Sequence, residues 1–155
     1  MASLTVIPDL AALKGFVGRP LGPTDWIEVP QSQIDAFAKA TGDHQWIHVD
    51  VERAKRESPF RGTIAHGYLT IALAPALLPQ IVRVEGIRMG VNYGIDSMRL
   101  PAPLPAGGRI RLAAQVKDVR EMPGGAARVT FALTFELEGG AKPVCVADVV
   151  YVYYA

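Results

Sequence analysis

The protein has 155 residues, of which 50% are hydrophobic and 20% are charged, and its formal net charge is +1. These values are typical of a single globular domain, taken here as residues 1–155, that can bury a core without disulfides or a structural metal. The near-neutral charge and the lack of a basic run with interleaved aromatic residues argue against nucleic-acid binding.

The N-terminal part of the chain is predicted to be a lead-in followed by a short strand. Residues 1–24 are rich in glycine and proline, so we expect a surface segment with at most a short helix around Asp9 to Lys14. Trp26 to Val29 has the composition of a strand and is bounded by Pro30.

A helix is predicted over Gln31 to Thr41, because its apolar residues follow i, i+3, i+4, i+7 spacing. Ser32 with Asp35 three residues later resembles a capping box at the start of this helix. Gly42 is a natural stop, since glycine adopts the left-handed conformation that follows many helices. Asp43 is therefore expected in irregular backbone.

Two further helices are predicted before the chain becomes extended. Val51 to Glu57 forms a short one, with Asp50 as its N-cap. Gly67 to Leu78 is apolar on nearly all faces, which is typical of a buried helix. Pro75 should bend or shorten it.

The second half of the chain is predicted to form four long antiparallel strands. Val84 to Leu100 contains glycines that suggest bulges, whereas the next two segments alternate apolar and polar residues. The last segment is apolar on both faces and is expected to be a central strand or a strand covered by a partner. A curved sheet wrapped around the one apolar helix buries both the helix and the apolar face of the sheet, so an α+β fold is predicted. The last three strands are expected at Arg109 to Arg120, Arg128 to Glu138 and Val144 to Tyr154.

The sequence also favours a cytoplasmic protein. Cys145 is the only cysteine, so no intramolecular disulfide can form, which suits a reducing compartment. The N-terminal residues lack the basic leader and the cleavage pattern of a signal peptide. The longest apolar run, Tyr68 to Pro79, is too short to span a membrane.

Asp43 and His48 are the strongest candidates for chemistry, on a loop expected between helices. A carboxylate and an imidazole five residues apart can hold one water, which the carboxylate deprotonates and the imidazole orients. The alternative is structural, with Asp43 capping the backbone of Gln45 or Trp46 and His48 satisfied in the core. Spacing alone leaves both interpretations open.

Gly67 is the second candidate, at the expected start of the apolar helix after His66. Free N–H groups at a helix start can stabilise a negative oxygen, and glycine lets a ligand approach the backbone. Equally, Gly67 can serve only to make the turn tight. Asn92-Tyr93-Gly94 lies inside a strand, where it either lines a pocket or forms a bulge. A metal site is not expected, because the spacing of His44 and His48 does not bring them to one face.

Three motifs in order resemble those of the MaoC-like (R)-specific enoyl-CoA hydratases. The first is FAKATGDHQWIH, residues 37–48, with Ala54 downstream. The second is IAHGYL at residues 64–69, at the start of the apolar helix, and the third is VNYGIDSMRL at residues 91–100. Many members have Asn-Pro where this chain has Gln45-Trp46, which retains an amide but adds bulk.

The resemblance implies a hot-dog fold and a homodimer whose sheets join edge to edge, with acyl-CoA bound near the interface. It also implies reversible syn hydration of trans-2-enoyl-CoA to (R)-3-hydroxyacyl-CoA without a metal or redox cofactor. Asp43 and His48 would hold the water, with Asp43 as the base, and the Gly67 N–H would polarise the thioester carbonyl. The candidate substrate-binding residues are Gln45, His66, Asn92 and Tyr93.

Two other functions remain open, a hot-dog acyl-CoA thioesterase and a non-catalytic acyl-thioester binding module. Thioesterases of this fold usually carry a carboxylate on or beside the central helix, but Gly67 to Leu78 has no acidic residue. A binding module would not need Asp43 or His48, and both are present.

Overall fold

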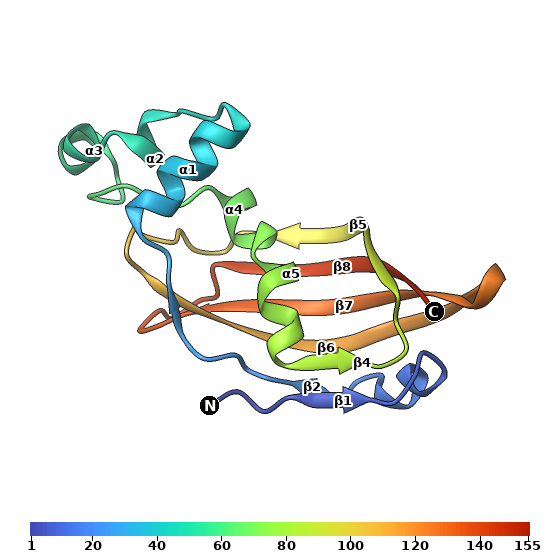
Figure 1. Ribbon diagram of the computed structural model, residues 1–155. Coiled ribbons are helices and arrows are strands. Elements are labelled where there is room, and N and C mark those ends of the chain that lie inside the picture. The colour runs from blue at the N-terminus through green and yellow to red at the C-terminus, as the bar shows by residue number, and fades with distance from the viewer.

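The strands form one curved sheet, seen in the computed structural model of residues 1–155 in Figure 1. Its order is β2-β6-β7-β8-β5, with β3 beside β6, and a small parallel pair, β1 with β4, lies apart from it. The bounds are β1 Thr5–Ile7, β2 Pro20–Leu21, β3 Ile27–Glu28, β4 Val82–Val84, β5 Met89–Arg99, β6 Arg109–Met122, β7 Ala126–Leu137 and β8 Cys145–Tyr154.

The alternation of apolar residues fixes which face of the sheet is buried. β6 pairs antiparallel with β7 from Ile110↔Leu137 to Met122↔Ala126. The apolar residues predicted to share a face are buried together, including Leu112, Phe131 and Phe135. β8 lies between β7 and β5 and is buried on both faces over much of its length, so the predicted central strand is confirmed.

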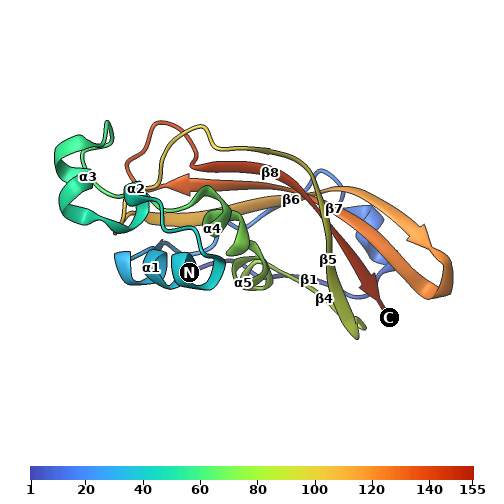
Figure 2. The same ribbon diagram turned by 90° about the horizontal axis from the view of Figure 1, so that it is seen from above.

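The central helix lies on the concave side of the sheet (Figure 2). It has two pieces, α4 Gly67–Ala72 and α5 Ala74–Leu77, followed by a 3₁₀ turn at Leu78–Gln80. Pro75 lies in the first turn of α5, because proline has no N–H to continue the α4 ladder. The predicted sheet around a central helix is confirmed.

The central helix is not buried all round, which corrects the prediction from its apolar composition. Leu69, Leu77 and Leu78 pack into the core. Tyr68, however, is 73% exposed, and Ala72, Pro75 and Ala76 lie on the same open side. A single chain therefore leaves one apolar face of this helix uncovered.

Most of the N-terminal segment lies on the surface, as predicted, but a few of its side chains also contribute to the core. Ile7, Leu13 and Leu21 are almost fully buried. β1 is held by its parallel pairing with β4, and the expected helix is a 3₁₀ helix at Ala11–Phe16. Such long-range burial is not visible in a glycine-rich and proline-rich composition.

Three helices gather at one end of the sheet, namely α1 Gln31–Thr41, α2 Trp46–Val49 and α3 Val51–Glu57. Gly42 ends α1 with φ of 81°, as predicted. Asp50 caps α3 by accepting a hydrogen bond from the Arg53 N–H at 3.0 Å, also as predicted. The predicted capping box is wrong, because Asp35 instead accepts from the Gln31 side chain. None of the helices in the structure is long and apolar enough to cross a membrane.

Strand β5 forms an open edge of the sheet. The predicted extended segment Val84 to Leu100 is split by a turn into the end of β4 and β5. β5 pairs only with β8, and the register shifts between Asn92 and Gly94 and again between Ile95 and Ser97, so the predicted bulges are confirmed. Nearly every residue of β5 is exposed.

Cys145 is fully buried at the start of β8. Burial disfavours the charged thiolate and raises the pKa of this thiol to about 11. The side chain therefore stays protonated near neutral pH and acts as a small apolar core residue.

Candidate active site

Asp43 lies directly after α1, where Gly42 turns the chain. One carboxylate oxygen, Oδ1, accepts a long hydrogen bond of 3.4 Å from the Gln45 N–H. The other, Oδ2, makes no hydrogen bond, and the side chain is 51% exposed. Asp43 thus caps the Gln45 backbone, as the structural alternative predicted, but only one of its two carboxylate oxygens is used for this.

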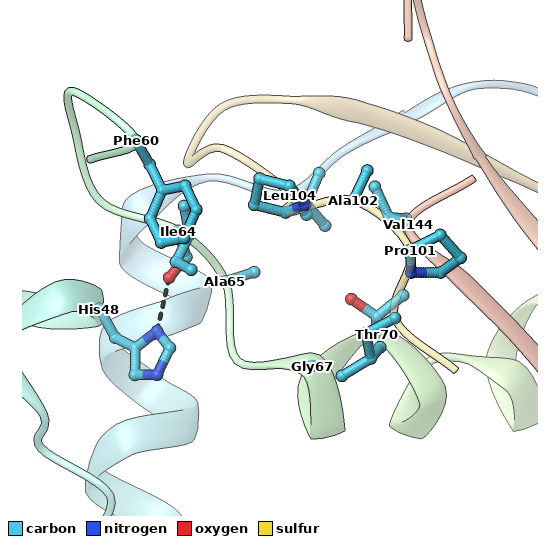
Figure 3. Close-up of a pocket in the computed structure, with 12 residues that line it drawn as sticks. His48, Phe60, Ile64, Ala65, Gly67, Thr70, Pro101, Ala102, Leu104 and Val144 are labelled. Atoms are coloured by element: carbon cyan, nitrogen blue, oxygen red, sulfur yellow. Dashed lines mark hydrogen bonds between the residues drawn. The ribbon is translucent and has the colours of Figure 1, made fainter. Parts of the chain in front are cut away.

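His48 lies on the short helix α2 and not on a loop, which corrects the prediction. It is 7% exposed, and its Nδ1 lies 2.7 Å from the Ile64 carbonyl oxygen (Figure 3). A carbonyl only accepts hydrogen bonds, so Nδ1 carries the proton in the neutral ring. Nε2 is therefore the atom with a free lone pair, and the same hydrogen bond fixes the tautomer and the orientation of the ring.

Gln31 supports His48 from the start of α1 and was missed by the sequence reasoning. Its amide nitrogen donates to the His48 carbonyl oxygen at 2.7 Å. Its amide oxygen accepts from the Thr63 hydroxyl at 2.5 Å. One side chain therefore ties α1 and α2 to the segment that leads into the central helix.

Asp43 and His48 are close enough to share one water. A carboxylate oxygen of Asp43 and one ring nitrogen each of His48 and His66 lie within 4.8 Å of one another. A water that donates to two acceptors spans about 4.5 Å between them, since each hydrogen bond is about 2.8 Å and the two meet near the tetrahedral angle. The pair can therefore hold a water by both of its hydrogens.

His66 lies behind this pair. Its ring stacks on that of His48 with centroids 3.9 Å apart and planes inclined by 24°. Its Nε2 donates to the Asp43 carbonyl oxygen at 3.0 Å, and Nδ1 is buried without a partner. His66 therefore braces both members of the pair, while its predicted contact with substrate stays a prediction.

The stacked rings bear on the expectation that no metal binds here. Ring nitrogen lone pairs lie in the plane of each imidazole. Because the His48 and His66 planes are nearly parallel, these lone pairs do not converge on one point. Tetrahedral coordination by both rings and Asp43 would require one ring to turn.

A cavity of about 310 Å³ lies between His48 and the start of α4 (Figure 3). Gly67 opens α4, so its N–H has no partner within the helix and points to the helix start. A Cβ at this position would lie 2.2 Å from Leu100 Cδ1, so any other residue would require the Leu100 side chain to move.

The rest of the cavity wall is almost entirely apolar. His48 and Thr70 are the only polar side chains among the residues that line it. A site of this kind can hold an apolar group beside a water-activating pair and a free N–H. The other lining residues are Phe60, Ile64, Ala65, Leu100, Pro101, Ala102, Pro103, Leu104 and Val144.

The remaining predicted residues lie away from the pair or at its margin. Gln45 is exposed at the start of α2, and His44 is exposed before it. Asn92 lines a second cavity of about 250 Å³, between the central helix and strands β5 and β8. Tyr93 is 61% exposed, with the Arg128 guanidinium 5.3 Å from its ring centroid. A substrate contact at Asn92 or Tyr93 would therefore lie outside the His48 cavity.

Comparison with known proteins identifies one protein family that this chain resembles over most of its length. The model of the MaoC like domain matches residues 13–134, which include Asp43, His48 and Gly67. The 3-hydroxyacyl-thioester dehydratase Z of Mycobacterium tuberculosis is 43% identical over 155 residues, covering all of both chains.

Solved structures share the fold. The monoamine oxidase regulatory protein of Archaeoglobus fulgius has a TM-score of 0.79 at 22% identity, with 99% of each chain covered. The (R)-hydratase of A. caviae has a TM-score of 0.67 at 23% identity, covering 87% of this chain and 94% of that one. These structures confirm the predicted hot-dog fold.

Proposed function

The chain belongs to the MaoC-like dehydratase family of hydro-lyases, and on that premise we propose that it is an (R)-specific enoyl-CoA hydratase. The reaction is reversible syn addition of water to trans-2-enoyl-CoA, which yields (R)-3-hydroxyacyl-CoA. One observation carries the proposal: a carboxylate oxygen of Asp43 and a ring nitrogen of His48 lie within 4.8 Å of each other, close to the span of one water, and His48 lines a cavity together with Gly67.

The pair orients the water for attack. When the water donates one hydrogen to the Asp43 carboxylate and the other to His48 Nε2, its oxygen lone pairs face the cavity. That oxygen bonds to the β-carbon of the enoyl group, and the Asp43 carboxylate takes the proton. The C=C electrons move to the thioester oxygen, where the Gly67 N–H stabilises the enolate.

The proton that Asp43 took from the water is then transferred to the substrate. As the enolate collapses, the Asp43–His48 pair delivers the proton to the α-carbon, so water oxygen and proton add to one face. The reverse sequence dehydrates the 3-hydroxyacyl thioester. The thioester itself makes the α-proton acidic, so this route needs no metal or redox cofactor.

The acyl thioester is the substrate class that suits the cavity. Its apolar wall fits an acyl group, and the relative with 43% identity is named for 3-hydroxyacyl thioesters. We propose coenzyme A as the carrier. Gln45, His66, Asn92 and Tyr93 remain the proposed substrate contacts.

The test is an assay with crotonyl-CoA. We expect the absorbance of its conjugated thioester to fall when the protein is added, with (R)-3-hydroxybutyryl-CoA as the product on chiral analysis. Release of free CoA would instead show a thioesterase. No reaction with either short or long enoyl chains would favour a binding module.

We also propose that two copies join through β5 to form a homodimer. This edge presents four exposed apolar side chains, Met89, Val91, Tyr93 and Ile95. It adjoins the open face of the central helix, because the second cavity is lined by both. Pairing of two β5 strands would satisfy their free backbone groups and cover both surfaces.

Charge on the edge should prevent this association. We expect sedimentation velocity to give twice the mass of one chain for the wild type and a single-chain mass for Val91→Lys. Val6→Lys is the matched control, because Val6 is a similarly exposed strand valine on β1. A wild-type protein that stays monomeric at high concentration, or a Val91→Lys dimer, would contradict the β5 interface.

A further inference from the structure

We propose that the Thr70 hydroxyl is a second hydrogen-bond donor to the thioester oxygen, beside the Gly67 N–H; this inference rests on the proposed hydratase function. Thr70 is 2% exposed, yet its side chain makes no hydrogen bond within the protein. Thr24, Ser58 and Thr63 are also buried and have partners, whereas the buried Thr130 on β7 makes no side-chain hydrogen bond either. Thr70 differs from Thr130 in lining the His48 cavity together with Gly67, so its hydroxyl can meet a bound ligand.

The position of Thr70 directs its hydroxyl to the reaction site. It lies three residues after Gly67 on α4, and both line the His48 cavity. Figure 3 shows the Thr70 side chain turned into this cavity near Gly67. Residues three apart share a helix face, and helical side chains lean toward the helix start, which brings the Thr70 side chain toward Gly67.

The usual local partner of a helical threonine is not engaged. A threonine hydroxyl commonly bonds to the carbonyl four residues earlier, which is His66 here. The His66 carbonyl oxygen instead accepts the N–H groups of Leu69 at 3.0 Å and Thr70 at 3.3 Å. The hydroxyl thus remains available to the cavity.

The chemistry of the cavity identifies the acceptor. Among the lining side chains only His48 is polar besides Thr70, and His48 is assigned to the water. In an enoyl thioester bound on the Gly67 N–H, the carbonyl oxygen gains charge as water adds to the β-carbon. A second donor at that oxygen stabilises the transition state more than the ground state. Thr70 forms only a hydrogen bond to this oxygen and no covalent bond, and its proton stays on the hydroxyl.

The first test compares Thr70→Val with Thr70→Ser. Valine keeps the shape and removes the hydroxyl, so we expect kcat for crotonyl-CoA hydration to fall by about 100-fold, with KM changed far less. Serine restores the donor and should recover most of kcat. Thr130→Val is the control, since Thr130 is also buried but lies on β7, and its kcat should match the wild type.

A spectroscopic readout separates polarisation from packing. In an Asp43→Asn background, which holds substrate without turnover, bound crotonyl-CoA should show a red-shifted thioester absorbance. Thr70→Val should reduce this shift, and Thr70→Ser should preserve it. An active wild type with an equally active Thr70→Val, or an unchanged shift, would overturn the role of Thr70. A wild type that hydrates no enoyl-CoA would instead refute the function on which it rests.

Discussion

Asp43→Asn is expected to lower kcat for hydration by about 1,000-fold or more while leaving the fold intact. The amide has the shape of the carboxylate but does not accept the proton of the attacking water. Stability should change little, because the side chain is half exposed and an asparagine oxygen can still accept from the Gln45 N–H. Absorbance at the conjugated thioester band measures the rate, and urea unfolding measures the stability.

Asp50→Asn is the matched control for this substitution. Asp50 lies seven residues later and caps α3 through the Arg53 N–H, a role that asparagine fills as well as aspartate. Its kcat should stay within about twofold of the wild type, because an N-cap contributes to stability and not to proton transfer. If Asp43→Asn retained more than a tenth of the wild-type rate, the base would have to be another group.

The parts of the site that depend on local sequence could be predicted. The spacing of apolar residues in α1 and the glycine after it place Asp43 correctly just past the helix end. Asp50 and the start of α4 at Gly67 follow from the same end signals. α2 could not be separated from a loop, because four residues are too few to show a helical period.

The parts of the site that depend on contacts between residues far apart in the chain could not be predicted. Gln31 reaches His48 across 17 residues and Thr63 across 32. The stack of His48 on His66 depends on how two segments pack, and nothing in either motif predicts it. Thr70 is one polar residue in an apolar helix, and only the structure shows that it lines the His48 cavity beside Gly67.

The difference between the predicted burial of the central helix and its exposed face has another cause. Its composition predicts burial on every side, yet Tyr68 is exposed, and the exposed Ala72 and Pro75 line a cavity with the edge strand β5. Composition reflects every surface that a sequence is selected to bury, including surfaces covered by another chain. The apparent error therefore supports the proposed β5 dimer, since a second copy would cover the face that one chain leaves open.

His48→Asn and His48→Gln should separate the two functions of this ring. An asparagine nitrogen can take the place of Nδ1 and keep the hydrogen bond to the Ile64 carbonyl, but nothing replaces Nε2. We expect a fold close to wild-type stability and a loss of kcat of about 100-fold or more. A glutamine amide reaches the Nε2 position but leaves Ile64 unpaired, so it should also lose about 1–3 kcal/mol of stability.

Glutamine should not rescue activity, because an amide oxygen can orient water but cannot pass a proton. Both variants are therefore expected to be nearly inactive, and only His48→Gln is expected to be less stable in urea unfolding. His44→Asn is the control, since this exposed histidine lies four residues earlier and should leave kcat and stability unchanged. An active His48→Asn would mean that His48 acts only through Nδ1, holding α2 against Ile64, and that Asp43 alone activates the water.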